Sequence, residues 1–410
     1  MSGKLASVKK LRINTLFFSA IVLTPIFLNP LINNFVNFRM NGIDSNLLEP
    51  IYAYLPVAMT LGVLGLDINI FRVFDECLNR FQLLIKSLSL SFISSILFGL
   101  AFILFFIEHI PDKNLIPYIL FAVPFSAMNM ILGAYLVRGE KYILLSLPLI
   151  LTPITRFSVN KILINTDYAG VKAMFLTSVI NFIISLIMVI LFARPERGSE
   201  SYKLPKIDLL NYWLYLNLVS LPFSLVPKIA GKIIDNNAEM LTSFGVIYFP
   251  IFFMLNRIFI NSYLIESTKK REDTLFRIFK NITIIAMTSL SALALLMIFM
   301  PNFFLDFMRY PNVADGRSIL VFVALAGPFY TYTTIVNATF IALDDRLALF
   351  FSTVISTILV ITLPVSTSGL NKNIAGLGWL IAYLLLTVIL TMTLMLRNDL
   401  HKVEKREDVI

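Results

Sequence analysis

The residues of this sequence that could bind a polar ligand are the charged ones inside long apolar segments. Arg257 lies in MLNRIFI, and Arg156 lies in LTPITRFSVNK. Charge is costly inside a membrane, so an arginine there either lines a polar cavity or extends to the interface. Because a guanidinium group binds phosphate through two parallel hydrogen bonds, both residues are candidates for holding an anionic headgroup. Ordinary interfacial arginines are the alternative for both.

Five further polar residues are candidates for binding or coupling. Asp67, in GLDINIF, could bind a coupling proton or sodium ion, although its place near the end of a predicted span favours an interfacial carboxylate. Lys161 and Lys228 lie near the predicted outer ends of spans, where they are interfacial or attract a headgroup on release. Asn129 and Asn337 could contact a sugar, or they could join neighbouring helices.

The elements that must position these residues are membrane helices. The 410 residues are 58% hydrophobic and 14% charged, whereas a soluble domain carries about 25% charged residues. So few charges cannot cover a surface exposed to water, which excludes a folded soluble domain. The single cysteine, Cys77, excludes an internal disulfide, and the two histidines lie in different connections. We therefore expect no catalytic residue, no metal site and no cofactor.

Hydropathy predicts twelve spans of about 20 residues or more. They lie near 14–36, 51–69, 84–107, 116–137, 142–164, 169–193, 209–229, 239–263, 281–304, 318–342, 347–366 and 374–396. These runs are too long for the short alternating strands of a membrane barrel, so we expect an all-α polytopic protein. The organisation that follows is an N-terminal six-helix bundle at 1–193, a cytoplasmic linker at 194–207, a C-terminal six-helix bundle at 208–396 and a cytoplasmic tail at 397–410.

Lysine and arginine residues are unequally shared between the two sides of the predicted membrane. The N-terminus, the central linker, the tail and the connections on the same side hold most of them, including KKREDTLFRIFKN at 269–281. Positive residues mark cytoplasmic loops, so both termini are expected in the cytoplasm and the first apolar segment is expected to be a retained span. This distribution explains the net charge of +9 without a nucleic acid partner.

A short internal repeat relates the two halves. AVPFSAMNMILGAYLVRGEKYILL at 122–145 aligns without gaps with AGPFYTYTTIVNATFIALDDRLAL at 326–349, matching Pro124 with Pro328 and Glu140 with Asp344. Because six spans is an even number, both halves enter the bilayer in the same direction, related by a pseudo-twofold axis along the membrane normal. A cavity between two such bundles can open alternately to either side, which predicts transport.

The order of weaker motifs resembles that of a known family. Gly245-Val246-Ile247-Tyr248 opens the eighth span, MPNFFLDFMRYPNVADGRSILVFVALAGPF occupies 300–329, and LGVLGL at 61–66 precedes Arg72. This pattern is similar to that of the Wzx-type O-antigen and polysaccharide flippases of the multidrug/oligosaccharidyl-lipid/polysaccharide superfamily. The resemblance implies a MATE-like fold. It also implies movement of an undecaprenyl-pyrophosphate-linked oligosaccharide from the cytoplasmic to the periplasmic leaflet.

The resemblance also implies a location and partners. It places the chain in the inner membrane as a transporter without enzymatic activity, with membrane lipids, a polysaccharide polymerase and a chain-length regulator as partners.

A MATE-like exporter of a drug or small organic anion would have the same composition and topology. A membrane-embedded polysaccharide polymerase or glycosyltransferase would need a catalytic loop, and the longest outer connection, roughly 305–317, is too short for one.

Overall fold

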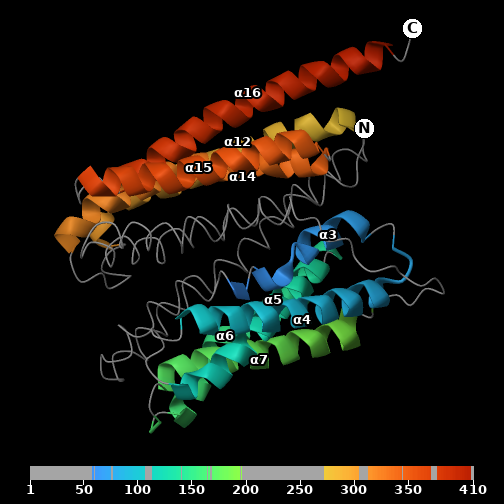
Figure 1. The fold of residues 1–410 in the computed structure, drawn as a ribbon, viewed down its shortest axis with the longest axis vertical. Helices are drawn as coiled ribbons and strands as arrows, with labels where there is room; N and C mark the ends of the chain where they lie inside the picture. The colour runs from blue at the N-terminus through green and yellow to red at the C-terminus, as the bar shows by residue number, and fades with distance from the viewer. Residues whose placement is uncertain are drawn as a thin grey trace. The chain divides into compact units, whose positions relative to one another are not determined.

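Two compact units, Met1–Tyr212 and Trp213–Ile410, make up the chain. The computed structural model describes residues 58–59, 61–74, 77–106, 113–139, 141–163, 165–166, 169–193, 195, 272–303, 313–343, 345–370 and 376–407. Every regular element in these residues is a helix (Figure 1). The described residues are thus all-helical, as the sequence predicts.

The first unit is built around a central helix, α5. Its elements are α3 (Leu66–Val73), α4 (Arg80–Phe106), the single 3-10 turn η2 (Lys113–Leu115), α5 (Ile116–Arg138), α6 (Tyr142–Leu163), and α7 (Ala169–Met188) with its π-helical extension η3 (Val189–Ala193). Helix α5 packs against α3, α4, α6 and α7. Its side chains at Ile119, Ala122, Val123 and Ile131 are fully buried, so α5 forms the core of this unit.

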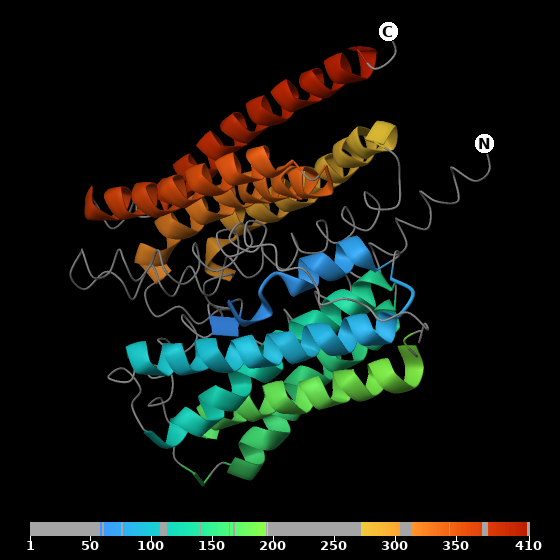
Figure 2. The same ribbon diagram turned by 45° about the vertical axis from the view of Figure 1, so that its right-hand side comes forward.

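The second unit is built in the same way around α14. Its helices are α12 (Glu272–Phe299), α14 (Val313–Ala342), α15 (Arg346–Leu370) and α16 (Leu377–Glu407). Helix α14 packs against α12, α15 and α16, and α15 packs against α16 (Figure 2). Leu320, Val323, Ala326 and Ile335 of α14 are fully buried. The helix that ends at the repeated turn is therefore the core of each unit.

The outer faces of these helices are apolar. On α4, Ile93, Leu97, Leu100 and Leu104 recur at helical spacing and are 58%, 63%, 43% and 74% exposed. A contiguous apolar face of this kind is unfavourable in water but suits contact with lipid. In the described part of the chain, seven helices are long and apolar enough to cross a membrane. The chain is a multi-pass membrane protein.

The turns that follow α5 and α14 share their hydrogen bonds. After α5, the Gly139 N–H donates to the Tyr135 carbonyl at 2.9 Å, and the Lys141 N–H donates to the Leu136 carbonyl at 2.8 Å. After α14, the matched donors are Leu343, to Thr339 at 2.9 Å, and Asp345, to Phe340 at 3.1 Å. Both helices also contain the matched prolines. The repeat in the sequence is therefore also a repeat in local structure.

One predicted span differs in form from the expectation. The sequence predicts a continuous second span at 51–69, but the helix is interrupted at Leu64 and Gly65, which have φ of 54° and 68°. Such left-handed angles are costly for leucine and easy for glycine. A new helix, α3, begins at Leu66 and continues to Val73. The segment has the hydropathy of a span. Because the residues at the interruption are uncharged and lie among apolar ones, an average of hydropathy does not detect it.

Candidate functional site

The sequence-predicted site residues fall in different places. Arg257 and Lys228 lie outside the described residues. Asn129 is half-buried on α5. Lys161 is exposed near the end of α6, where its ammonium group lies 5.1 Å from the centre of the Phe157 ring. Within the described residues, Arg156 is the predicted phosphate ligand that lies among other polar groups.

Arg156 belongs to a polar face of α6. Thr152, Arg156 and Asn160 are spaced by four residues, which places them above one another on a helix. Arg156 is half-buried and Asn160 is 5% exposed. With α6 ending at Leu163, the guanidinium-bearing residue lies about 10 Å from the helix end at 1.5 Å per residue. The sequence predicts a span over 142–164, which ends one residue beyond this helix.

Helix α7 extends this polar face. The Nδ2 group of Asn181, which is 6% exposed, donates a hydrogen bond of 2.7 Å to the Thr152 hydroxyl. The Oδ1 atoms of Asn181 and Asn160 are buried without a hydrogen-bond partner. Amide oxygens accept hydrogen bonds from hydroxyl groups, and a guanidinium donates to phosphate. We call Thr152, Arg156, Asn160 and Asn181 the α6/α7 polar face; together they offer both kinds of contact.

A second polar region surrounds the interrupted helix. Asp67 lies in the first turn of α3 and is 5% exposed. The Gly62 carbonyl accepts hydrogen bonds from Ser91, at 3.2 Å, and from Ser94 of α4. The regular donor to this carbonyl would be the N–H of Leu66, which lies beyond the interruption. Serine hydroxyls take its place, as is needed where a membrane helix breaks.

Sequence reasoning missed these serines. Ser87, Ser91, Ser94 and Ser95 lie in KSLSLSFISS, and all four are less than 8% exposed. Their spacing of four, three and one residues places them on one face of α4. That spacing was the available signal, because an apolar membrane helix with hydroxyls gathered on one face orients that face inward.

Two arginines, one at the start of α4 and one at the end of α5, pack on an aromatic ring. The guanidinium carbons of Arg80 and Arg138 lie 4.5 Å and 5.7 Å from the centre of the Phe74 ring. Arg138 is 3% exposed, and Arg80 Nε donates to the Phe74 carbonyl at 3.2 Å. Cations over a ring face are attracted to it. These residues fix the end of α3 against α4 and α5.

In the second unit, Asn337 joins two helices. Its side chain is fully buried on α14, and its Oδ1 accepts a hydrogen bond from Ser352 of α15. Its Nδ2 has no hydrogen-bond partner. Nearby on α14, Tyr330 lies edge-on to Tyr383 of α16, with ring centres 5.2 Å apart. This arrangement agrees with the interpretation of Asn337 as a helix-joining residue.

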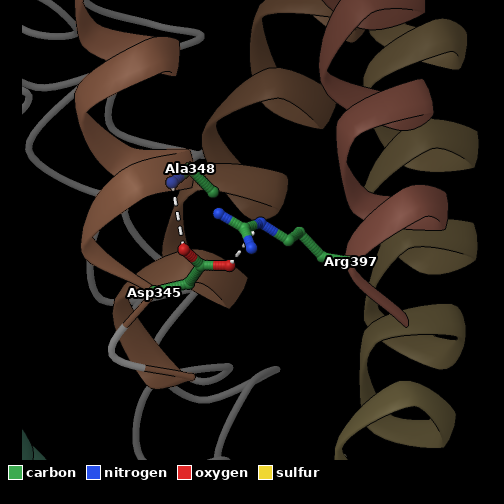
Figure 3. Close-up of polar contacts among 3 residues, drawn as sticks. All are labelled: Asp345, Ala348 and Arg397. Atoms are coloured by element: carbon green, nitrogen blue, oxygen red, sulfur yellow. Dashed lines mark hydrogen bonds and ion pairs between the residues drawn. The ribbon is translucent and has the colours of Figure 1, made fainter. Parts of the chain in front are cut away.

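An ion pair closes one end of the second unit. Arg397 Nε on α16 lies 3.0 Å from Asp345 Oδ2, and the other carboxylate oxygen accepts the Ala348 N–H at 3.0 Å (Figure 3). Asp345 thus caps α15 and links it to α16 at the same time. Within the described ranges, no group of three or more His, Cys, Asp or Glu residues is placed to hold a metal ion.

Comparison with known proteins gives a fold. No model of a protein family matches the sequence, and neither does any curated protein. A crystal structure of MATE in complex with MaD5 is similar over 95% of this chain and 96% of its own, with TM-score 0.68 and 13% identity. The chain has the MATE fold.

Two further solved structures carry the same fold. A MOP superfamily transporter from Pyrococcus furiosus matches with TM-score 0.67 and 14% identity, over 94% of this chain and 95% of that one. A mutant of the Vibrio cholerae MATE transporter VcmN matches with TM-score 0.66 and 13% identity, over 94% and 98%. The structural similarity establishes the architecture. At identities this low, the cargo must be argued from the residues of this chain.

Proposed function

We propose that this protein is a transporter that flips an undecaprenyl-pyrophosphate-linked oligosaccharide, such as an O-antigen or related polysaccharide unit, between leaflets by alternating access. The observation that carries the proposal is the α6/α7 polar face, on which half-buried Arg156 lies one turn from Asn160 and one turn from Thr152, the acceptor of the Asn181 amide. The MATE fold supports the mechanism, because solved transporters share it.

A lipid flippase must solve one physical problem. The polar headgroup has to cross a region where charge is expensive, while the lipid tail stays in the bilayer. An arginine stabilises the pyrophosphate through bidentate hydrogen bonds, and neighbouring amide oxygens accept hydrogen bonds from sugar hydroxyls. The α6/α7 polar face supplies both groups, and no covalent step is required.

Other expectations from the sequence belong to the same proposal. The headgroup is moved from the cytoplasmic to the periplasmic leaflet of the inner membrane, with both termini in the cytoplasm. Arg257, Lys161, Lys228 and Asn129 are further cavity candidates, whereas Asn337 joins α14 to α15. A polymerase and a chain-length regulator receive the flipped product.

Export of a drug or small organic anion is the second candidate. One structure with this fold is an outward-facing multidrug resistance MATE family transporter, matched with TM-score 0.63 and 13% identity over 95% of this chain and 96% of that one. The reversed polarity of the binding pocket suggests a different function for the Pyrococcus furiosus transporter. Pocket polarity therefore indicates cargo, and a cation on the α6/α7 polar face favours an anionic one.

Reconstitution tests the proposal. The purified full chain is placed in liposomes with a fluorescent lipid-linked oligosaccharide, and flipping is followed by loss of protection from a membrane-impermeant quencher. Arg156→Ala is expected to slow flipping about tenfold to a hundredfold, the range for a lost hydrogen bond to a charged group. Arg156→Lys is expected to restore part of the rate, because the charge remains without the bidentate geometry.

Ser158→Ala is the matched control on α6. This hydroxyl is exposed and donates to the Ile154 carbonyl of its own helix at 3.0 Å, so flipping should stay at the wild-type rate. Wild-type flipping by Arg156→Ala would remove the α6/α7 polar face from the site. No flipping by the wild type, together with uptake of a small organic anion by the same liposomes, would establish the second candidate.

A further inference from the structure

We propose that the α6/α7 polar face selects an acidic glycan, in which a negatively charged sugar lies between two hydroxyl-bearing sugars. Arg156 binds the acidic group, and the side-chain oxygens of Asn160 and Asn181 accept hydrogen bonds from hydroxyl groups on either side of it. The inference rests on the proposed function, because it names the class of cargo that the same face carries.

Two buried oxygen atoms of this face accept no hydrogen bond. Asn160 is 5% exposed and Asn181 is 6% exposed, and the Oδ1 atom of each is buried without a hydrogen-bond partner. An amide oxygen has two lone pairs and no proton, so only a donor can satisfy it. A buried acceptor without a donor carries a desolvation cost, which a ligand with hydroxyl groups would remove.

The two oxygens lie on opposite sides of Arg156 along the helix. Asn160 follows Arg156 by one turn of α6, and Thr152 precedes it by one turn. Asn181 donates to the Thr152 hydroxyl at 2.7 Å, so its amide lies at the level of Thr152. The eight residues from Thr152 to Asn160 cover about 12 Å at 1.5 Å per residue. A ligand that reaches both amides therefore extends past Arg156 in both directions.

A positive group between two acceptors defines the order of groups in the ligand. The ligand presents a donor, then an acidic group, then a second donor. A guanidinium carries five N–H donors, so a contact of Arg156 within the protein does not prevent it from binding an acidic group as well. The face therefore fits a chain of sugars with its charge in an internal unit.

Pyrophosphate alone would use only half of this face. In a lipid-linked oligosaccharide it has sugar hydroxyls on one side and an apolar tail on the other, so it can engage one amide oxygen at a time. An acidic sugar inside the glycan can engage both. As the headgroup crosses the membrane, Arg156 binds the pyrophosphate and the acidic sugar in turn, and alternating access opens the face to one side at a time.

Equilibrium binding to the purified full chain tests this order of groups. The probes are three soluble trisaccharides: one with glucuronate as the central sugar, its isomer with glucuronate at the non-reducing end, and a neutral one. The central isomer is expected to bind about tenfold to a hundredfold more tightly than the neutral trisaccharide, the range for a hydrogen bond to a charged group. It is expected to bind about twofold to tenfold more tightly than the terminal isomer, which can engage one amide.

Substitutions on the face assign the two kinds of contact. Arg156→Gln is expected to bind the acidic and neutral trisaccharides alike. Asn160→Leu and Asn181→Leu are each expected to weaken binding of the central isomer about twofold to tenfold and to remove its advantage over the terminal isomer, because one side of the face then lacks an acceptor. Ser158→Ala is the matched control, since this exposed hydroxyl bonds to the Ile154 carbonyl of its own helix, and binding should stay at the wild-type level.

Asn160→Leu also separates a binding role from a structural one. Leucine is similar in size, and the oxygen that it replaces has no partner to lose, so thermal unfolding should occur at the wild-type temperature or above it. Asn181→Leu also removes the hydrogen bond to Thr152, so it should unfold at a lower temperature. Weaker binding by Asn160→Leu at unchanged stability is a result that a purely structural asparagine would not give.

The outcomes distinguish this inference from the proposed function. Preference for the central isomer in a protein that flips no lipid would support the acidic glycan and contradict the flippase. In liposomes, equal flipping of lipid-linked oligosaccharides with neutral and with internally acidic glycans would overturn the inference and leave the flippase standing. The inference would also be overturned if the central and terminal isomers bound equally, if no trisaccharide bound, or if Asn160→Leu kept wild-type binding.

Discussion

The hydroxyl groups beside the interrupted second span and those along the helices of the second unit differ in their bonding partners. In the first unit, Ser91 and Ser94 of α4 donate to the Gly62 carbonyl of a separate segment. In the second unit, twelve hydroxyls on α14, α15 and α16 donate to carbonyls three or four residues earlier in the same helix, whereas Ser352 of α15 donates to Asn337 of α14. The twelve donors are Thr331, Thr333, Thr334, Thr339, Thr353, Thr357, Thr362, Ser366, Thr367, Thr387, Thr391 and Thr393.

This difference shows that hydroxyl groups have two distinct effects in membrane helices. A hydroxyl that donates to a carbonyl of its own helix makes its hydrogen bond locally. The helix therefore stays continuous, and no other segment is needed to bond the hydroxyl. A hydroxyl that bonds to another segment makes an interruption of that segment possible, because it replaces a missing backbone donor. The same residue types therefore support uninterrupted α15 and the interrupted second span.

The largest expected effect comes from a substitution at a closely packed glycine of the second unit. A Cβ atom at Gly378 of α16 would lie 2.4 Å from Pro364 Cα and 2.6 Å from the Leu363 carbonyl oxygen. Both are backbone atoms of α15, which must shift. We expect Gly378→Ala to destabilise the protein by about 1–3 kcal/mol or more, because overpacking strains the contact. Thermal unfolding in detergent measures this as a lower apparent Tm.

Two other glycines calibrate this expectation. Gly62→Ala should destabilise less, because its closest neighbour is the Ser95 hydroxyl at 2.0 Å, although Ser95 Cα lies at 2.9 Å. Gly99→Ala should have no adverse effect, because the nearest atom would be 3.7 Å away. Equal Tm values for the Gly378 and Gly99 variants would contradict the close approach of α15 and α16.

The turn after each core helix provides the second contrast. Asp345 caps α15 and pairs with Arg397, whereas the matched residue in the first unit is Lys141, which is exposed. We expect Asp345→Ala to cost about 1–2 kcal/mol, since it removes a helix cap and an ion pair. Chemical or thermal unfolding of the purified variant provides the measurement.

Asp345→Asn separates the two contributions. Asparagine caps a helix as well as aspartate does, so this variant should lose only the ion pair, about 1 kcal/mol or less at a partly exposed arginine. Lys141→Ala should leave stability unchanged. If the alanine and asparagine variants at 345 are equally destabilised, the cap contributes nothing and the expectation fails.

The third contrast concerns one amide in each unit. Asn181 donates to Thr152 across α7 and α6, and Asn337 accepts from Ser352 across α14 and α15. Hydrogen bonds between membrane helices contribute about 0.6 kcal/mol on average and about 1.7 at most. Double-mutant cycles with Asn181→Ala and Thr152→Ala, and with Asn337→Ala and Ser352→Ala, should both give coupling energies in this range. A coupling near zero in either cycle would show that the pair does not join its helices.

The fold was accessible from the sequence because its determinants are local. Apolar runs predict the helices, and the repeat around Pro124 and Pro328 predicts two similar halves. The turn hydrogen bonds after α5 and α14 then follow the same register. An alternation of long apolar segments and short polar turns is sufficient to predict an all-helical membrane protein.

The candidate sites were less accessible because they depend on contacts between segments. The interruption at Leu64 and Gly65 lies within apolar sequence, and its stability comes from Ser91 and Ser94 about thirty residues away. The partner of Thr152 is likewise on another helix. Arg156 could be identified alone, since a charge in an apolar run is visible without knowing its neighbours.

The smallest expected effect tests the contrast in hydroxyl bonding directly. Thr362→Ala and Ser366→Ala remove exposed hydroxyls that bond within α15, so each should change stability by no more than about 0.5 kcal/mol, because alanine has the higher helix propensity and no buried partner is left unpaired. Ser91→Ala should cost about 1 kcal/mol, because the released Gly62 carbonyl loses a donor inside the protein. Thermal unfolding of the three variants side by side measures the difference. If Thr362→Ala were as destabilised as Ser91→Ala, hydroxyls bonded within a helix would matter as much as hydroxyls bonded between segments, and this contrast would fail.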